Sequence, residues 1–290
     1  MSEFVIVTDS AADLSEALVR EMGVEVLPLR FTIEGETYED HPDRRAMSIE
    51  EFYDRLRRGQ MATTSAVNVG DYHDILRPIL ESGKDVLVLA FSSGLSTTYQ
   101  SAAIAAEELA EEFPARKIAV VDTLCASLGE GLIVWHAVNM KKAGKSLEEI
   151  RDWVEANKLH LIHWVAVDDL NHLKRGGRIS ATTAFVGGML SIKPIIHVDN
   201  EGKLINVGKA RGRAASLKQV ADKVLELSDP KQGQTIFISH SDCLADAQVI
   251  GEKLKAAGLA SQVFYNHIGP VIGAHTGPGT VAVFALGTER

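Results

Sequence analysis

The chain has 290 residues, of which 46% are hydrophobic and 24% charged, a composition typical of a globular protein with a sizeable core. The formal net charge of −9 and the pI near 5.6 argue against a nucleic-acid partner, because proteins that bind phosphate backbones usually carry a basic face. The N-terminus has no signal-peptide pattern, and no apolar run approaches the roughly 18 residues that span a bilayer. We therefore expect a cytoplasmic protein without stable membrane insertion.

The first part of the chain alternates short apolar runs with helical patterns. The predicted strands cover residues 4–8, 24–33 (as extended chain), 85–91 and 117–121. The predicted helices cover residues 14–22, 48–59, 71–81, 96–113, 128–143 and 146–157. Strands that alternate with helices indicate right-handed βαβ units around a mainly parallel sheet. The sequence therefore predicts an N-terminal α/β domain over residues 1–160, with helices flanking the sheet.

The pattern changes after about residue 160. A strand over 161–167 is followed by helical stretches up to Leu190, and two extended runs, 194–198 and 203–210, flank a turn at 199–202 that reads as a hairpin. A helix over 214–227, a strand over 235–239, a helix over 244–257 and two final strands complete the chain. These elements predict a second α/β domain with a mixed sheet over residues 161–290.

Hydroxyl-bearing residues cluster where predicted strands end. Residues 92–98 supply five hydroxyls and one glycine at the start of a helix, where backbone N–H groups and the helix dipole favour an anion. This position suits a ligand, because open parallel sheets bind ligands beyond the carboxyl ends of their strands. A structural N-cap with solvent-facing serines remains an alternative. Residues 63–65, Thr-Thr-Ser, are expected in a loop ahead of the helix at 71–81.

Two further clusters carry polar groups among glycines. Residues 269–279 are glycine-dense, which permits close backbone approach, and His275 is the one strongly polar side chain in what we expect to be a tight loop. A histidine in this setting is a ligand contact or a satisfied structural residue. Residues 173–180 join three cations to two glycines; they contact an anion or a partner, or form a solvated loop.

Common enzyme and metal motifs are missing from the sequence. There is no G-x-S-x-G nucleophile elbow and no Walker A loop, and no histidine pair has a convincing metal spacing. A serine hydrolase acting on acyl esters is the enzymatic alternative, with Ser93 or Ser96 as nucleophile and His275 as base. The acidic third member would have to come from Asp9 or Asp122.

Several motifs, in their order along the chain, resemble those of the DegV family. The resemblance covers nearly the whole chain and rests on residues 8–10 (Thr-Asp-Ser), 64–65 (Thr-Ser), 92–96 (Ser-Ser-Gly-Leu-Ser), 127–129 (Ser-Leu-Gly), 174–180 (Lys-Arg-Gly-Gly-Arg-Ile-Ser), 193–195 (Lys-Pro-Ile), Arg211 with Arg213, and 269–279. The resemblance rests on the motifs taken together, in the same order along the chain.

The resemblance implies a fatty-acid-binding protein similar to the B subunit of a fatty acid kinase. It implies two α/β domains with one long-chain fatty acid in a tunnel between them, and no other cofactor or metal. A partner fatty acid kinase would phosphorylate the bound carboxylate for phospholipid synthesis, so the chain itself would be a carrier and not an enzyme; a monomer is the default. The implied carboxylate ligands are Thr64, Ser65, Ser93, Ser96 and His275, and the implied contacts to the phosphoryl group or the kinase are Arg178, Arg211 and Arg213.

The sequence departs from the family pattern at two places. Thr97 stands where the family usually has glycine, and Ala66-Val67 replaces a polar residue followed by proline. Neither change removes a proposed hydroxyl, but both bear on the shape of the head-group loops.

Overall fold

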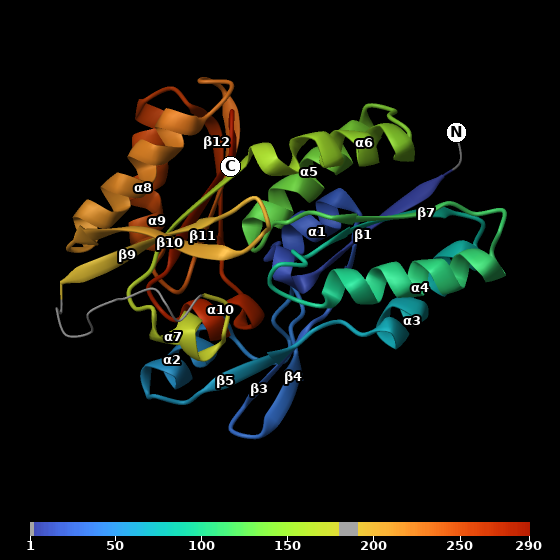
Figure 1. Cartoon of the computed structure of the whole chain (residues 1–290), viewed down its shortest axis with the longest axis horizontal. Helices are drawn as coiled ribbons and strands as arrows, with labels where there is room; N and C mark the ends of the chain where they lie inside the picture. The colour runs from blue at the N-terminus through green and yellow to red at the C-terminus, as the bar shows by residue number, and fades with distance from the viewer. Residues whose placement is uncertain (1–2, 180–190) are drawn as a thin grey trace.

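The computed structural model describes residues 3–179 and 191–290. Two α/β domains lie side by side along the long axis, as the sequence predicts (Figure 1). The strands of a four-stranded and a three-stranded sheet all precede residue 160, and those of a six-stranded sheet all follow it. The helical stretches predicted up to Leu190 lie partly outside the described residues; within them, α7 covers Asn171–Arg175.

The N-terminal domain is built on a parallel sheet of four strands in the order β2-β1-β6-β7. Its strands are β1 (Phe4–Asp9), β2 (Glu25–Leu27), β6 (Asp85–Ala90) and β7 (Ile118–Asp122), and its helices are α1 (Glu16–Met22), α3 (Val69–Glu81), α4 (Thr98–Glu112), α5 (Leu128–Lys142) and α6 (Leu147–Asn157). All of β6 is buried, because Val86 and Val88 pack towards α3 and α4 while Leu87 and Leu89 pack towards α5. A parallel sheet covered on both faces needs such continuously apolar strands.

A small antiparallel sheet, which the sequence patterns did not predict, extends this domain. It consists of β3 (Arg30–Ile33), β4 (Glu36–Glu39) and β5 (Ala62–Ser65), with α2 (Ile49–Arg57) between β4 and β5. Residues 63–65 are therefore in a strand and not in the predicted loop. Local sequence patterns do not reveal this pairing, because β5 contains three hydroxyl residues and its partner β3 lies about thirty residues earlier. The sheet and α2 share a core of Phe31, Phe52 and Tyr53.

The C-terminal domain contains a mixed sheet of six strands in the order β10-β9-β8-β13-β11-β12, in which β11 and β12 are parallel. Its strands are β8 (Leu161–Ala166), β9 (Ile192–Val198), β10 (Leu204–Arg211), β11 (Gln234–His240), β12 (Ala260–His267) and β13 (Val281–Leu286). The hairpin predicted around residues 199–202 is confirmed, since β9 and β10 pair antiparallel. Helices α8 (Arg213–Leu227) and α9 (Leu244–Ala256) cover one face, and the other face packs against α5 of the N-terminal domain.

One short helix replaces the tight loop predicted near the C-terminus. Helix α10 covers Pro270–Thr276 and carries His275 in its last turn. Pro270 occupies the first turn, where its missing N–H costs nothing, and Gly277 ends the helix with a φ of 74°. Figure 1 shows α10, in red, beside the blue α2 and β5, so this helix of the C-terminal domain meets the small sheet of the N-terminal domain.

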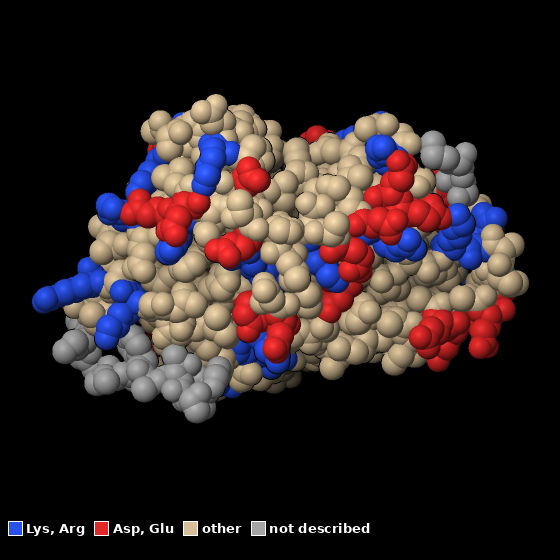
Figure 2. Space-filling model, turned by 45° about the horizontal axis from the view of Figure 1, so that its top comes forward, with Lys and Arg blue, Asp and Glu red and all other residues tan. Residues whose placement is uncertain are grey.

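No helix within the described ranges is long and apolar enough to cross a membrane. On the face that Figure 2 shows, the visible Lys and Arg side chains are interspersed with Asp and Glu and form no continuous basic band.

Candidate binding site

A cavity of about 480 Å³ lies between the two domains. This volume falls within the range of roughly 300–1,000 Å³ that is usual for small-molecule sites. Most of its wall is apolar, and part of it comes from the face of the six-stranded sheet that meets α5. The apolar wall includes Leu29, Phe91, Val165, Ile196, Val198, Leu204, Val271, Ala282 and Phe284.

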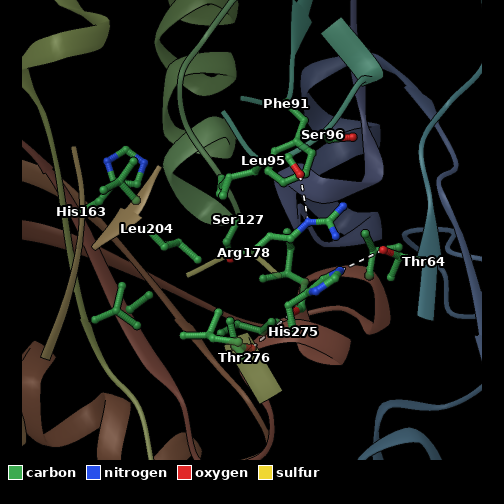
Figure 3. A pocket seen from close by; sticks show the side chains of 18 of the residues that line it. Thr64, Phe91, Leu95, Ser96, Ser127, His163, Arg178, Leu204, His275 and Thr276 are labelled. Atoms are coloured by element: carbon green, nitrogen blue, oxygen red, sulfur yellow. Dashed lines mark hydrogen bonds between the residues drawn. The ribbon is translucent and has the colours of Figure 1, made fainter. Parts of the chain in front are cut away.

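The cavity runs along β8 and β13, as their register shows. His163 pairs with Phe284, and Val165 pairs with Ala282 two residues further along; all four line the cavity. His163 marks one end. Figure 3 places His163 and Leu204 on one side of the view, while Thr64 and His275 lie on the other, so the cavity has an apolar end and a polar end.

The polar end brings together the five residues that the sequence singled out as head-group ligands. Thr64 and Ser65 come from β5, Ser93 and Ser96 from the loop between β6 and α4, and His275 from α10; each lines the cavity. Thr64 Oγ1 and His275 Nε2 are 2.8 Å apart and share a hydrogen bond (Figure 3). Three segments far apart in the sequence, from both domains, therefore build one polar end.

His275 is held in its neutral form. Its Nδ1 is buried and has no hydrogen-bond partner within the described part of the chain. Burial, with a smaller contribution from the nearby Arg178, lowers the pKa of His275 to about 4. The imidazole also packs tightly against Gly176, since a Cβ added there would lie 2.1 Å from Nδ1. At neutral pH, the polar end is therefore a set of uncharged hydrogen-bonding groups beside one guanidinium.

The loop before α4 combines structural and cavity-facing hydroxyls. Ser92 and Thr98 are fully buried, and Ser92 Oγ donates to the carbonyl of Gly202 at 2.8 Å. Ser96 Oγ accepts the N–H of Thr98, and the N-cap residue itself, Thr97, makes no side-chain capping bond. Thr97 lines the cavity with a φ of −84°, so this position does not require glycine. The Ser93 side chain faces the cavity, and its backbone N–H donates to Asp122.

The three arginines predicted to meet a phosphoryl group or a partner do not lie together. Arg178 lines the polar end, and its guanidinium donates to the carbonyls of Leu95 and Gly176. Arg213 is paired instead with Asp246, at 2.9 Å, and does not line the cavity. Arg211 is exposed at the end of β10 and is also absent from the wall.

A groove of about 230 Å³ lies on the other side of the hydrogen-bonded Thr64–His275 pair. Arg175 and Arg178 supply two guanidinium groups to its wall, and the Oε1 of Gln60 is buried there without a partner among the described residues. The polar end of the cavity thus adjoins this groove, with which it shares Thr64, Arg178 and His275.

Ser127 and His163 also line the cavity, although neither was assigned a role from the sequence. Ser127 has a φ of 54°, and its Oγ donates to Asp13 and contacts Ser239. His163 is 1% exposed; its Nδ1 bonds the Leu161 carbonyl at 2.8 Å, and burial lowers its pKa well below the usual range. A histidine within the apolar run of residues 161–167 was the available signal for His163.

Across residues 3–179 and 191–290, no group of three or more His, Cys, Asp or Glu side chains is arranged to hold a metal ion. The site offers hydroxyls, one neutral imidazole and one guanidinium, which suit a carboxylate or phosphate head group followed by an apolar body.

Fold and site together define a class of two-domain α/β proteins that enclose an elongated cavity, apolar along its length and polar at one end. The chain belongs to the DegV family: the family model described as "Uncharacterised protein, DegV family" matches residues 3–288.

Relatives with similar sequences and structures extend this comparison. A DegV domain-containing protein of Clostridium perfringens is 46% identical over 290 residues, which cover 100% of this chain and 99% of the relative. A DegV family protein of Thermus thermophilus, described for its fatty acid binding, has 32% identity and a TM-score of 0.87 over 99% of this chain and 100% of that one. A fatty acid binding DegV family protein of Streptococcus agalactiae has 30% identity and a TM-score of 0.86, with 100% of both chains covered.

Proposed function

We propose that this protein binds a single long-chain fatty acid, with its carboxylate at the Thr64–His275 end and its acyl chain along β8 and β13. The observation that carries the proposal is the polarity of the cavity: hydroxyls, imidazole and guanidinium gather at one end, and the wall beyond them is mostly apolar. The fatty acid binding described for the Thermus thermophilus and Streptococcus agalactiae relatives supports this reading.

The energetics of such a ligand favour tight binding. Each buried methylene contributes about 0.8 kcal/mol, so roughly fourteen methylenes contribute about 11 kcal/mol before ordering costs are subtracted. The carboxylate loses hydration on entry and needs donors in return. Thr64, Ser93 and Ser96 supply hydroxyls, and Arg178 supplies a charge nearby.

The proposal includes presentation of the bound carboxylate to a separate fatty acid kinase, with the chain acting as a carrier and not as a catalyst. The groove beyond the Thr64–His275 pair supports this step, because a phosphoryl donor that approaches through it would meet Arg175 and Arg178. Guanidinium groups bind phosphate oxygens in bidentate fashion. Arg211 and Arg213 lie outside the cavity wall, so any role of theirs would be in contact with the partner.

The binding step is tested by titrating delipidated protein with palmitate and with hexadecanol, which carries the same chain without the carboxylate. We expect saturation at one equivalent of palmitate, with weaker binding of hexadecanol. Absence of palmitate binding would refute the proposal. The presentation step is tested separately: with a bacterial fatty acid kinase and ATP, phosphorylation of palmitate should depend on this protein, and a rate unchanged by its addition would refute that part.

The geometry gives less support to the hydrolase alternative. A serine nucleophile needs a histidine base that a third group orients, but Nδ1 of His275 has no partner within the described ranges. The two candidate acids are engaged elsewhere, since Asp9 accepts the N–H of Phe91 and Asp122 accepts that of Ser93. We expect no labelling by a fluorophosphonate probe; stoichiometric labelling at Ser93 or Ser96 would favour the hydrolase.

A further inference from the structure

Helix α10, which carries His275, has no capping side chain of its own. Its N-cap residue is Gly269, and no side chain of the cap position accepts a hydrogen bond from the first turn. The first N–H groups of a helix need acceptors, and an isolated helix of seven residues is not stable by itself. The position of His275 therefore depends on groups that lie outside the helix.

A buried carboxyl from the N-terminal domain supplies an acceptor at the start of the helix. Asp13 Oδ1 accepts the N–H of Gly269 at 2.8 Å, and a second buried carboxyl, Asp40, pairs with Arg44. Asp13 is 1% exposed and Asp40 is 2% exposed. Arg44 forms an ion pair with Asp40 and also interacts electrostatically with Asp13, so it partly offsets the cost of burying both carboxyls.

The side chains of Asp13 and Arg44 lie very close to the backbone at the start of α10. A Cβ added to Gly269 would lie 2.8 Å from both Asp13 Oδ1 and Arg44 Nη1, so no larger residue fits without a shift. The hydroxyl of Tyr53, on α2, is equally close to α10. It donates to the Ile268 carbonyl at 2.8 Å, and a Cβ added to Gly273 would lie 2.6 Å from it.

We propose that Asp13 and Tyr53 are positioning residues that hold the start of α10 from the opposite domain and thereby hold His275 against Thr64. Asp13 also accepts a hydrogen bond from Ser127, which lines the same cavity, so one buried carboxyl supports two parts of the wall. The inference rests on the proposed function, in which the Thr64–His275 pair meets the ligand head group.

The contacts that hold α10 therefore belong both to the domain interface and to the wall of the binding site. Asp13 and Tyr53 come from the N-terminal domain, His275 comes from the C-terminal domain, and the cavity lies between the domains. A change that loosens these contacts should weaken recognition of the head group much more than it weakens recognition of the acyl chain. A residue with a merely structural role would affect both equally.

The test compares affinities for palmitate and hexadecanol in three variants. Y53F removes one hydroxyl. D13G removes a carboxyl at a position whose φ of 51° glycine tolerates, and D13N keeps an acceptor at the same position. We expect Y53F and D13G to lose roughly tenfold in palmitate affinity and less than threefold in hexadecanol affinity. D13N should recover most of the loss. Equal losses for both ligands would overturn the inference.

A matched control is Q234L. Gln234 is also buried and also bridges backbone groups, through bonds to Leu286 and Pro230, but it does not line the cavity. Its removal should lower the melting temperature without changing the ratio of the two affinities. A ratio that changes as much as in Y53F would contradict the inference.

A second readout needs no ligand and separates this inference from the proposed function. Burial lowers the pKa of His275 to about 4 in the intact protein. The assay is an NMR titration of the His275 imidazole. In Y53F and D13G the pKa should rise towards the free value of about 6.5 as α10 loosens, and in Q234L it should not change. A His275 pKa unchanged in both variants would overturn the inference even if palmitate binds. A shifted pKa without palmitate binding in the intact protein would sustain it and refute the proposed function.

Discussion

Replacing Val198 by phenylalanine is expected to shorten the acyl chain that the cavity accepts. Val198 is 2% exposed and lines the cavity at the end of β9. It follows His197, which pairs with Trp164, and so lies near His163 at the apolar end, away from Thr64. The change should therefore act on the tail of the ligand and leave the head group in place.

The magnitude follows from the carbons that the substitution adds. Phenylalanine has four more side-chain carbons than valine, and they occupy space that about four terminal methylenes would fill. At about 0.8 kcal/mol for each methylene, the longest accepted acid loses about 3 kcal/mol, or roughly 100- to 200-fold in affinity. An acid shorter by four carbons should bind almost as it does to the unaltered protein.

The assay is a series of competition titrations with saturated acids from C10 to C18. The matched control is V263F on β12, because Val263 is partly buried against the α8–α9 side of the sheet and does not line the cavity. It should leave the order of affinities unchanged. If V198F lowers the affinity for all chain lengths by the same factor, the orientation assigned to the ligand is wrong.

Three more predictions concern the head group and the buried carboxyls. T64V removes the hydroxyl that bonds His275 and should lower palmitate affinity by roughly 5- to 30-fold, as measured by titration; an unchanged affinity would exclude Thr64 from the head-group site. G176A would place a Cβ 2.1 Å from His275 Nδ1 and should weaken palmitate binding, whereas G208A, with no atom nearer than 3.4 Å, should not. Burial raises the pKa of Asp9 from 3.8 to about 7. Between these two values the folded state keeps a proton on Asp9 that the unfolded state releases, so the free energy of unfolding falls as pH rises from about 4 to about 7. The melting temperature of the intact protein relative to D9N should therefore decrease between about pH 4 and pH 7; a constant difference would contradict the burial argument.

Local patterns made most of the fold predictable. The buried run of β6 and the helices that follow the strands indicated a parallel sheet, and the Asp199–Gly202 turn indicated the β9–β10 hairpin. These features depend on periodicity and turn chemistry, which act over a few residues. The small sheet of β3, β4 and β5 was missed because its pairing joins short strands separated by α2.

The sequence indicated which residues lie at the polar end of the cavity, but it did not indicate the contacts between them. Thr64, Ser93 and His275 stood out as hydroxyl or imidazole groups in unusual local settings, and all three line the cavity. The hydrogen bond between Thr64 and His275 spans 211 positions, and no local pattern encodes such a separation. The glycines around His275 were interpreted as a loop, because the side-chain acceptor at the start of α10 comes from Asp13 in the other domain.

The different positions of Arg178 and Arg213 could not be predicted from their motifs. Arg178 reaches the cavity because its guanidinium spans to the carbonyl of Leu95, whereas Arg213 is drawn to Asp246 on α9. Both belong to motifs shared with the family, and only the packing of α7 and α8 separates their positions.

The most direct test of the central claim is denaturing extraction of the freshly purified protein from a bacterial host, followed by mass spectrometry of the extracted lipids. The account predicts about one equivalent of a long-chain fatty acid per chain. An extract without fatty acid, from protein that also fails to take up added palmitate, would contradict it.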